Sequence, residues 1–198
     1  MCTHSEFINL IYFYYPQNCE YGSTAYKKSN EYLRLKEKIN DSGLRSSLKK
    51  KTLTNIKLAF PKNYIRKFTR KDYPSIHYSV LLHKNQPILD DDEELLVALN
   101  GRRLDLEIYV SFLGNYFYTF VVETIKPSNE KNLKFSILNE NSISYTEELS
   151  SLTNNFLSLG FIKLNREIAH EFVPNIKLEC QDEAKVFHCI FTDLVNNY

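Results

Sequence analysis

Residues 104–125 read LDLEIYVSFLGNYFYTFVVETI, and this stretch carries the clearest structural signal in the chain. Apolar and polar residues alternate through two runs, and that period of two is typical of a β-strand. Gly114 and Asn115 separate the runs, and this pair suits a two-residue hairpin turn. The stretch therefore predicts an antiparallel β-hairpin.

The two faces of this hairpin differ in composition. The face expected to be core carries Leu104, Leu106, Ile108, Val110, Phe112, Phe117, Thr119 and Val121. The other face mixes charged, polar and aromatic residues, namely Asp105, Glu107, Tyr109, Ser111, Tyr118 and Phe120. Such a mixed face suits either a thin helical cover or an exposed contact surface.

The flanking sequence predicts further elements of both kinds. We expect strands at residues 7–15, 76–83, 134–138, 176–180 and 185–195. Helices are expected at residues 24–39, directly before Gly101, from a Ser144 to Glu147 capping box to Gly160, and at residues 165–172. This order indicates a single α+β domain over residues 1–198, with a mostly antiparallel or mixed sheet and several packed helices. Residues 42–75 are expected to form a basic, irregular segment within it.

Composition places the chain among ordinary globular proteins. It has 198 residues, of which 43% are hydrophobic and 25% charged, and its four cysteines form no CxxC pair. We find no export leader and no apolar stretch of the length that a membrane helix needs. The expectation is a cytoplasmic protein with reduced thiols that does not enter a membrane.

The search for catalytic patterns yields none. The five glycines form neither a phosphate-binding loop nor a nucleophile turn, and the five histidines lack the spacing of a metal site. Glu167 and His170 are read as the end of an amphipathic helix. We therefore expect no enzyme activity, no cofactor and no metal.

Charge is unevenly distributed along the chain. Residues 42–71 contain ten basic residues and no acid, whereas the whole chain has a net charge of only +1. Aromatic residues interleave with the basic ones, a pattern that suits phosphate contacts and base stacking. One hypothesis is therefore a nucleic-acid-binding module that uses Lys49, Lys50, Lys51, Arg66, Lys67, Arg70 and Lys71.

The rest of the chain is acidic and rich in tyrosine, which favours a different partner. Acidic and aromatic side chains together suit a basic protein, because charge speeds encounter and buried rings supply affinity. The candidate partner-binding residues are Asp90, Asp91, Asp92, Glu93, Tyr109, Tyr116, Tyr118 and Phe120. Each tyrosine is also compatible with burial beneath a helix.

Three segments together resemble bacterial immunity proteins of polymorphic toxin systems. They are RLDLEIY at residues 103–109, FVPNIKLE at 172–179 and VFHCIFTD at 186–193. The resemblance implies a cytoplasmic protein that binds a cognate toxin domain and neutralises it by occluding its active site. It transfers no contact residues by position.

Overall fold

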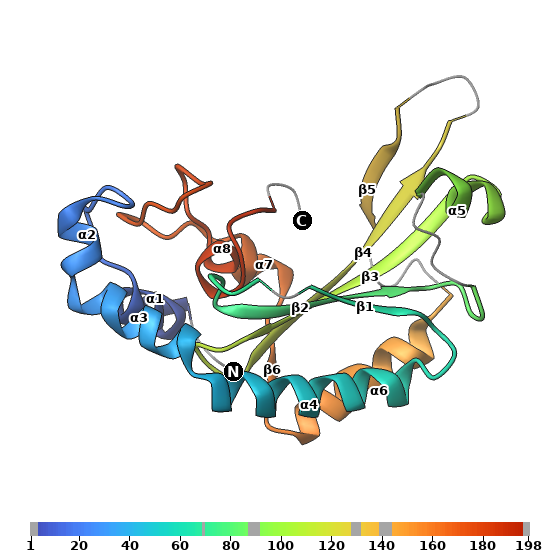
Figure 1. Cartoon of the computed structure of the whole chain (residues 1–198), viewed down its shortest axis with the longest axis horizontal. Helices are drawn as coiled ribbons and strands as arrows, with labels where there is room; N and C mark the ends of the chain where they lie inside the picture. The colour runs from blue at the N-terminus through green and yellow to red at the C-terminus, as the bar shows by residue number, and fades with distance from the viewer. Residues whose placement is uncertain (1–3, 69, 87–91, 128–131, 139–143, 196–198) are drawn as a thin grey trace.

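The fold is one sheet with helices on both faces, described here from a computed structural model (Figure 1). The structure describes residues 4–68, 70–86, 92–127, 132–138 and 144–195. Within these ranges the sheet has six strands in the order β1-β2-β3-β4-β5, with β6 beside β4. All pairings are antiparallel except that of β4 with β6. The predicted α+β class is confirmed.

The strands are β1 Ile65–Phe68, β2 Ser75–Leu81, β3 Arg102–Ser111, β4 Tyr116–Ile125, β5 Lys134–Leu138 and β6 Ile162–Lys163. The helices are α1 His4–Tyr14, α2 Thr24–Lys28, α3 Asn30–Asn40, α4 Ser42–Ala59, α5 Asp92–Ala98, α6 Thr146–Ser158, α7 Arg166–His170 and α8 Val186–Ile190.

The predicted hairpin is β3 and β4, but its turn is longer than expected. Val110 pairs with Phe117, which leaves residues 112–115 as the loop, whereas a two-residue turn would have paired Leu113 with Tyr116. The difference shifts the register by two residues. Because side chains alternate with a period of two, the predicted faces are unchanged.

Two predicted strands are helices. Residues 7–15 lie largely in α1, and residues 185–195 begin with α8, of which every residue is buried. Both segments are mostly apolar, and periodicity does not separate a buried helix from a buried strand in so short a run. Within α1 the buried Phe7, Ile11 and Tyr14 are spaced by four and three residues, which is a helical stripe.

The segment 42–75 is more regular than predicted. Asp41 caps α4 by accepting a hydrogen bond from the Leu44 backbone N–H, at 2.9 Å. The buried residues of α4 are Thr52, Ile56 and Ala59, again at helical spacing. Lys50, Lys51 and Lys57 are exposed on the helix, and the segment continues into β1.

Two helix boundaries also differ from the prediction. Ser29 divides residues 24–40 into α2 and α3, because its hydroxyl accepts from the Tyr32 N–H and so starts a new helix. Helix α6 begins after Tyr145 without a side-chain cap, so the Ser144 capping box is absent. Its predicted end at Gly160 is confirmed, and that residue has a φ of +82°.

The two sides of the sheet are covered differently (Figure 1). Helices α4 and α6 pack on the face that carries Leu106, Ile108 and Val110, which are fully buried there. The opposite face is covered by α8 and by side chains of the N-terminal helices. That second cover reaches only part of the sheet, and the uncovered part forms the candidate site.

Candidate binding cleft

The uncovered part of the sheet forms a cleft of about 820 Å³ between β1–β5 and the C-terminal segment. Residues directly opposite one another on neighbouring strands point to the same face. Here Arg66, Ser79, Glu107 and Phe120 form one such row across β1, β2, β3 and β4. The row beside it is Phe68, His77, Tyr109 and Tyr118.

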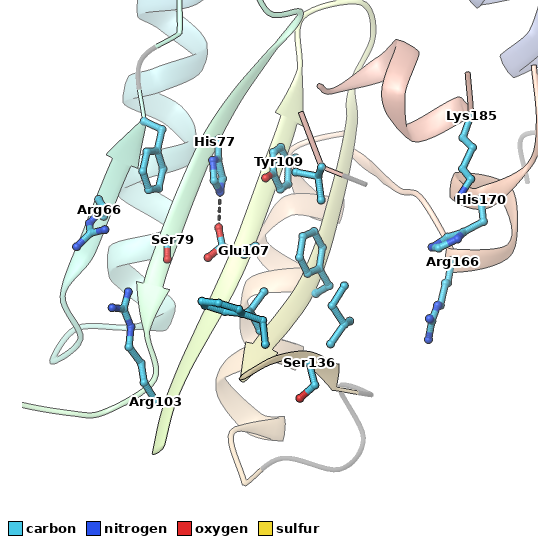
Figure 2. Close-up of a pocket in the computed structure, with 16 residues that line it drawn as sticks. Arg66, His77, Ser79, Arg103, Glu107, Tyr109, Ser136, Arg166, His170 and Lys185 are labelled. Atoms are coloured by element: carbon cyan, nitrogen blue, oxygen red, sulfur yellow. Dashed lines mark hydrogen bonds and ion pairs between the residues drawn. The ribbon is translucent and has the colours of Figure 1, made fainter. Parts of the chain in front are cut away.

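Four Arg and Lys residues line this cleft against one acidic residue, Glu107. They come from separate elements: Arg66 from β1, Arg103 from β3, Arg166 from the start of α7 and Lys185 from the residue before α8. Figure 2 shows Arg66 and Arg103 on the sheet and Arg166, His170 and Lys185 on the opposite wall. We call this site the cationic cleft.

The aromatic rings of the cationic cleft stack on one another. The His77 ring lies between Phe68 and Tyr109, with ring centroids 4.4 and 4.2 Å apart and planes within 15° and 7° of parallel. These rings are therefore stacked face to face from strand to strand across the floor of the cleft.

Glu107 is held by the stacked histidine. The His77 Nε2 atom hydrogen bonds to the Glu107 carboxylate, which is largely shielded from solvent (Figure 2). A carboxylate beside a histidine is also part of many proton-transfer sites. In this cleft both faces of the His77 ring and its Nε2 atom already have protein partners.

Arg103 forms a buried ion pair with Asp105 at the rim of the cationic cleft. Its Nε lies 2.6 Å from one carboxylate oxygen and its Nη2 lies 3.1 Å from the other, which is the two-pronged geometry that arginine favours. Burial raises the pKa of Asp105, and the neighbouring guanidinium opposes that rise. The pair fixes Arg103 on the sheet.

The structure buries most of the predicted tyrosine surface. Tyr109, Tyr118 and Phe120 are 6% exposed or less. Helix α8 covers them, and its Phe187 ring centroid lies 5.3 Å from that of Tyr109 and 5.4 Å from that of Tyr118. Of the two readings that the sequence allowed, the helical cover is correct for these three residues.

The other predicted partner-binding residues lie elsewhere. Tyr116 is half-buried against Phe7 of α1, with ring centroids 4.9 Å apart. Asp90, Asp91 and the side chain of Asp92 lie outside the described residues. Glu93 is exposed on α5 and pairs with Lys126 Nζ at 2.9 Å. Of the acidic candidates the structure thus describes only the side chain of Glu93, and it does not place that residue beside the aromatic candidates.

The candidate nucleic-acid-binding residues are divided between the two sides of the sheet. Arg66 lines the cationic cleft, while the next residue, Lys67, pairs with Tyr78, whose hydroxyl bonds to Thr52 of α4 on the other side. Lys49, Lys50 and Lys51 are on α4 itself. Lys51 donates to the Leu159 carbonyl at 3.1 Å, so part of this charge fastens α4 to the end of α6.

Arg70 and Lys71 lie in the loop after β1. Arg45 of α4 holds that loop by donating to both of their carbonyl oxygens, at 3.0 Å to Arg70 and 3.3 Å to Lys71. The Arg70 guanidinium lies 5.8 Å from the Tyr73 ring centroid. Arg70 and Tyr73 line a smaller hollow that shares Phe68, His77 and Tyr109 with the cationic cleft.

Several residues of the cationic cleft could not be selected from the sequence. Arg103, Arg166 and Lys185 lie outside the basic run, in segments of mixed charge. Only strand register and the fold of the C-terminal segment bring them to Arg66. Glu107 was assigned to the correct face of the hairpin, but nothing in the sequence pairs it with His77.

Comparison of the chain with known protein families, with characterised proteins and with solved structures gives no match in any of the three. In the described parts of the chain, His, Cys, Asp and Glu side chains do not gather in groups of three or more that could hold a metal ion. None of the helices in those parts is long and apolar enough to cross a membrane. The cationic cleft is therefore interpreted from its own chemistry.

Proposed function

We propose that this protein binds and neutralises a toxin domain, as the resemblance to immunity proteins implies, and that the cationic cleft holds an acidic segment of that domain. The observation that carries the proposal is that Arg66, Arg103 and Arg166 line one open cleft, with Arg66 and Arg166 on its two opposite walls. Opposite charge across an interface speeds association and selects the partner. Neutralisation is by occlusion, takes place in the cytoplasm and needs no reaction or cofactor of its own.

The position of the cations supports binding by a prepared surface. Arg66 and Arg103 stand on strands, and the Asp105 carboxylate holds Arg103 in place. Charges fixed on a rigid sheet lose little conformational freedom when a partner binds, which favours affinity. Arginine also pairs with carboxylates through two parallel hydrogen bonds, so side chains of Asp or Glu are suitable ligands.

A protein segment suits the cationic cleft better than a nucleic-acid strand does. Single-stranded nucleic acids are bound by stacking bases on free aromatic faces. The His77 ring is covered on both faces by Phe68 and Tyr109, so among the described lining residues Phe135, which is 70% exposed, is the one ring largely open to solvent. A volume of about 820 Å³ also suits a short segment rather than a long polymer.

The test is co-expression with the product of the neighbouring gene. The wild-type chain is expected to restore growth and to co-purify with that product. Reversing two cations in the R66E/R166E variant should abolish protection and weaken binding at least about ten-fold, because two attractive contacts become repulsive. Arg103 is left unchanged because its loss would leave Asp105 buried without its partner.

The matched control is the K50E/K57E variant. It changes the net charge by the same amount, and both lysines are exposed on α4 at the other side of the sheet. Full protection is expected from this control. Equal protection by R66E/R166E and wild type would contradict the assignment of the cleft, and no protection by the wild type would remove the proposed function itself.

Nucleic-acid binding is a second proposal, favoured by the group of Arg45, Lys49 and Lys67 beside β1. Burial, together with the nearby charges of Lys67 and Arg45, lowers the pKa of Lys49, as expected where cations crowd together. A nucleic-acid strand would have to wrap around the β1 edge of the sheet to reach both this group and Arg66. Salt-dependent retention on single-stranded DNA or RNA, lost when Lys49, Lys50 and Lys51 are changed to glutamine, would support it.

A further inference from the structure

A second cavity, separate from the cationic cleft, lies where three distant segments meet. The first segment is the start of the chain through α3, the second is the loop before β2, and the third is the C-terminal segment that runs beside them (Figure 1). Contacts between the first and third include a hydrogen bond from the Asn18 N–H to the Asn175 carbonyl at 2.8 Å and an ion pair of Lys177 Nζ with Glu20 at 2.5 Å. The cavity has a volume of about 270 Å³.

Tyrosine is the dominant residue of this cavity, which we call the tyrosine cavity. Its aromatic lining is Tyr15, Tyr21, Tyr26, Tyr32 and Tyr73. The Tyr26 ring is flanked by Tyr21 and Tyr32, with centroids 5.1 and 5.0 Å apart and planes tilted by 59° and 54°. Rings tilted in this way form concave walls instead of one flat stack.

Asp193 supplies a buried carboxylate to the lining of the tyrosine cavity. It is only 8% exposed, and its Oδ2 accepts from the Cys180 backbone N–H at 3.1 Å. Its Oδ1 atom is buried and has no hydrogen-bond partner within the described ranges. An unsatisfied buried carboxylate oxygen is costly, so a cationic ligand that approached it would recover free energy.

The other charged residues that line the tyrosine cavity leave a negative balance. Glu179 accepts a hydrogen bond from the Tyr21 hydroxyl at 3.2 Å and is exposed at the mouth. Asp72 is opposed by Lys36, whose Nζ lies 3.7 Å away. Two carboxylates, those of Asp193 and Glu179, therefore remain to face a cation.

His188 does not offset this negative charge. Its Nδ1 atom accepts from the Lys185 backbone N–H at 3.2 Å, so the ring is neutral at that nitrogen. Burial lowers the pKa of His188, which keeps the imidazole uncharged at neutral pH. Burial, reinforced by the charge of Asp193, raises the pKa of Tyr73 to about 12, so its hydroxyl stays protonated.

We propose that the tyrosine cavity binds an alkylammonium group, with the tyrosine rings forming cation–π contacts and Asp193 and Glu179 supplying the opposite charge. A cation within about 6 Å of an aromatic ring is attracted to its face, and several rings around one site are the usual arrangement for ammonium ligands. The volume of about 270 Å³ suits one such group and not a large cofactor. The group is a lysine side chain of a protein or a small quaternary amine.

The test is calorimetric titration of the whole chain with three probes. Choline presents a quaternary ammonium, Nα-acetyl-lysine amide presents a primary one, and dimethylbutanol is the uncharged carbon isostere of choline. Saturable binding of either cation, at least about ten-fold tighter than that of the alcohol, is expected. The tighter of the two cations identifies the source of the group. Equal binding of the alcohol and choline, or no binding of either cation, would overturn the proposal.

Two variants with matched controls assign the binding to this cavity. Asp193→Asn keeps an acceptor for the Cys180 N–H while removing the charge, and Tyr21→Leu removes a ring that is 38% exposed. Each should weaken binding of the preferred cation about five-fold or more. Asp182→Asn and Tyr64→Leu change exposed residues outside the lining and should not alter it. Equal affinity in all four variants would place the cation elsewhere and contradict the assignment.

Discussion

The two faces of the sheet show how one set of strands serves two purposes. On the face under α4 and α6, Leu106, Ile108 and Val110 follow one another along β3 and are all fully buried. On the other face, α8 covers Tyr109 and Ser111, whereas Glu107 and Arg103 line the cationic cleft. The same strand is therefore core on one side and changes from core to binding surface along the other.

This difference separates the residues that stabilise the sheet from those that line the binding surface. A fully covered face gives stability in proportion to the apolar area that it removes from water. A half-covered face leaves charged side chains on strands that the opposite core already holds in place. Variants can separate these contributions, because a change on the closed face should affect stability alone.

The largest effect is expected from truncating a core ring on each face. Phe156 of α6 and Phe187 of α8 are both fully buried, so Phe156→Ala and Phe187→Ala should each lower the free energy of unfolding by about 3–5 kcal/mol. Phe187→Ala should also weaken partner binding in the folded protein, because Phe187 packs on Tyr109 beside the cleft. Urea unfolding followed by circular dichroism measures the first quantity. Equal binding by both variants would contradict the coupling of α8 to the cleft.

A smaller but specific effect is expected from breaking the Arg103–Asp105 pair. Arg103→Met should destabilise the protein by about 3 kcal/mol at neutral pH, because it leaves a buried carboxylate without its partner. Burial already raises the pKa of Asp105. The loss of stability in the variant should therefore be greatest where the Asp105 carboxyl is ionised, and it should shrink as acid protonates that group. The R103M/D105L double variant should recover most of the stability. Urea midpoints at neutral and acid pH test both statements.

The smallest effect is expected in the pH dependence of stability, through His83 beside the start of β3. His83 Nε2 accepts from the Leu104 backbone N–H at 3.1 Å, and burial, together with Arg102 and Arg103, lowers the His83 pKa. The contribution of His83 to the free energy of unfolding is fully present above about pH 6.5, which is its pKa in the unfolded chain. It is lost as the pH falls through the lower pKa of the folded protein. His83→Gln should flatten this part of the stability profile. A profile identical to that of wild type would show that another group is responsible.

The central sheet was predictable because its signal is local. Alternation through residues 104–125 assigned both faces correctly, even though the loop proved longer than the predicted Gly114–Asn115 turn. Segments that are mostly apolar were not predictable in the same way. Residues 7–15 and 185–195 are mostly apolar in sequence, and even the exposed position 13 carries a phenylalanine, so their helical period is hidden among apolar neighbours.

The cationic cleft was largely unpredictable for a different reason. Arg66 was among the candidates because it lies in a basic run, but Arg103 and Arg166 reach it only through strand register and the course of the C-terminal segment. The basic run was also a poor guide to the site, because side chains alternate along β1 and Lys67 therefore lies on the face opposite Arg66. The number of basic residues in a stretch of sequence shows how many cations are present. Only the fold determines which of them face the same ligand.

The most direct test of the account uses tryptophan, which the sequence lacks entirely. Phe135 lines the cationic cleft and is 70% exposed, and Leu58 is 68% exposed on α4 at the opposite face. Titrating the F135W and L58W variants with the co-purified partner domain, and following indole emission, reports occupancy of each face separately. We predict a saturable change in the F135W variant and none in the L58W variant. A change in the L58W variant alone would contradict the assignment of the cationic cleft as the binding site.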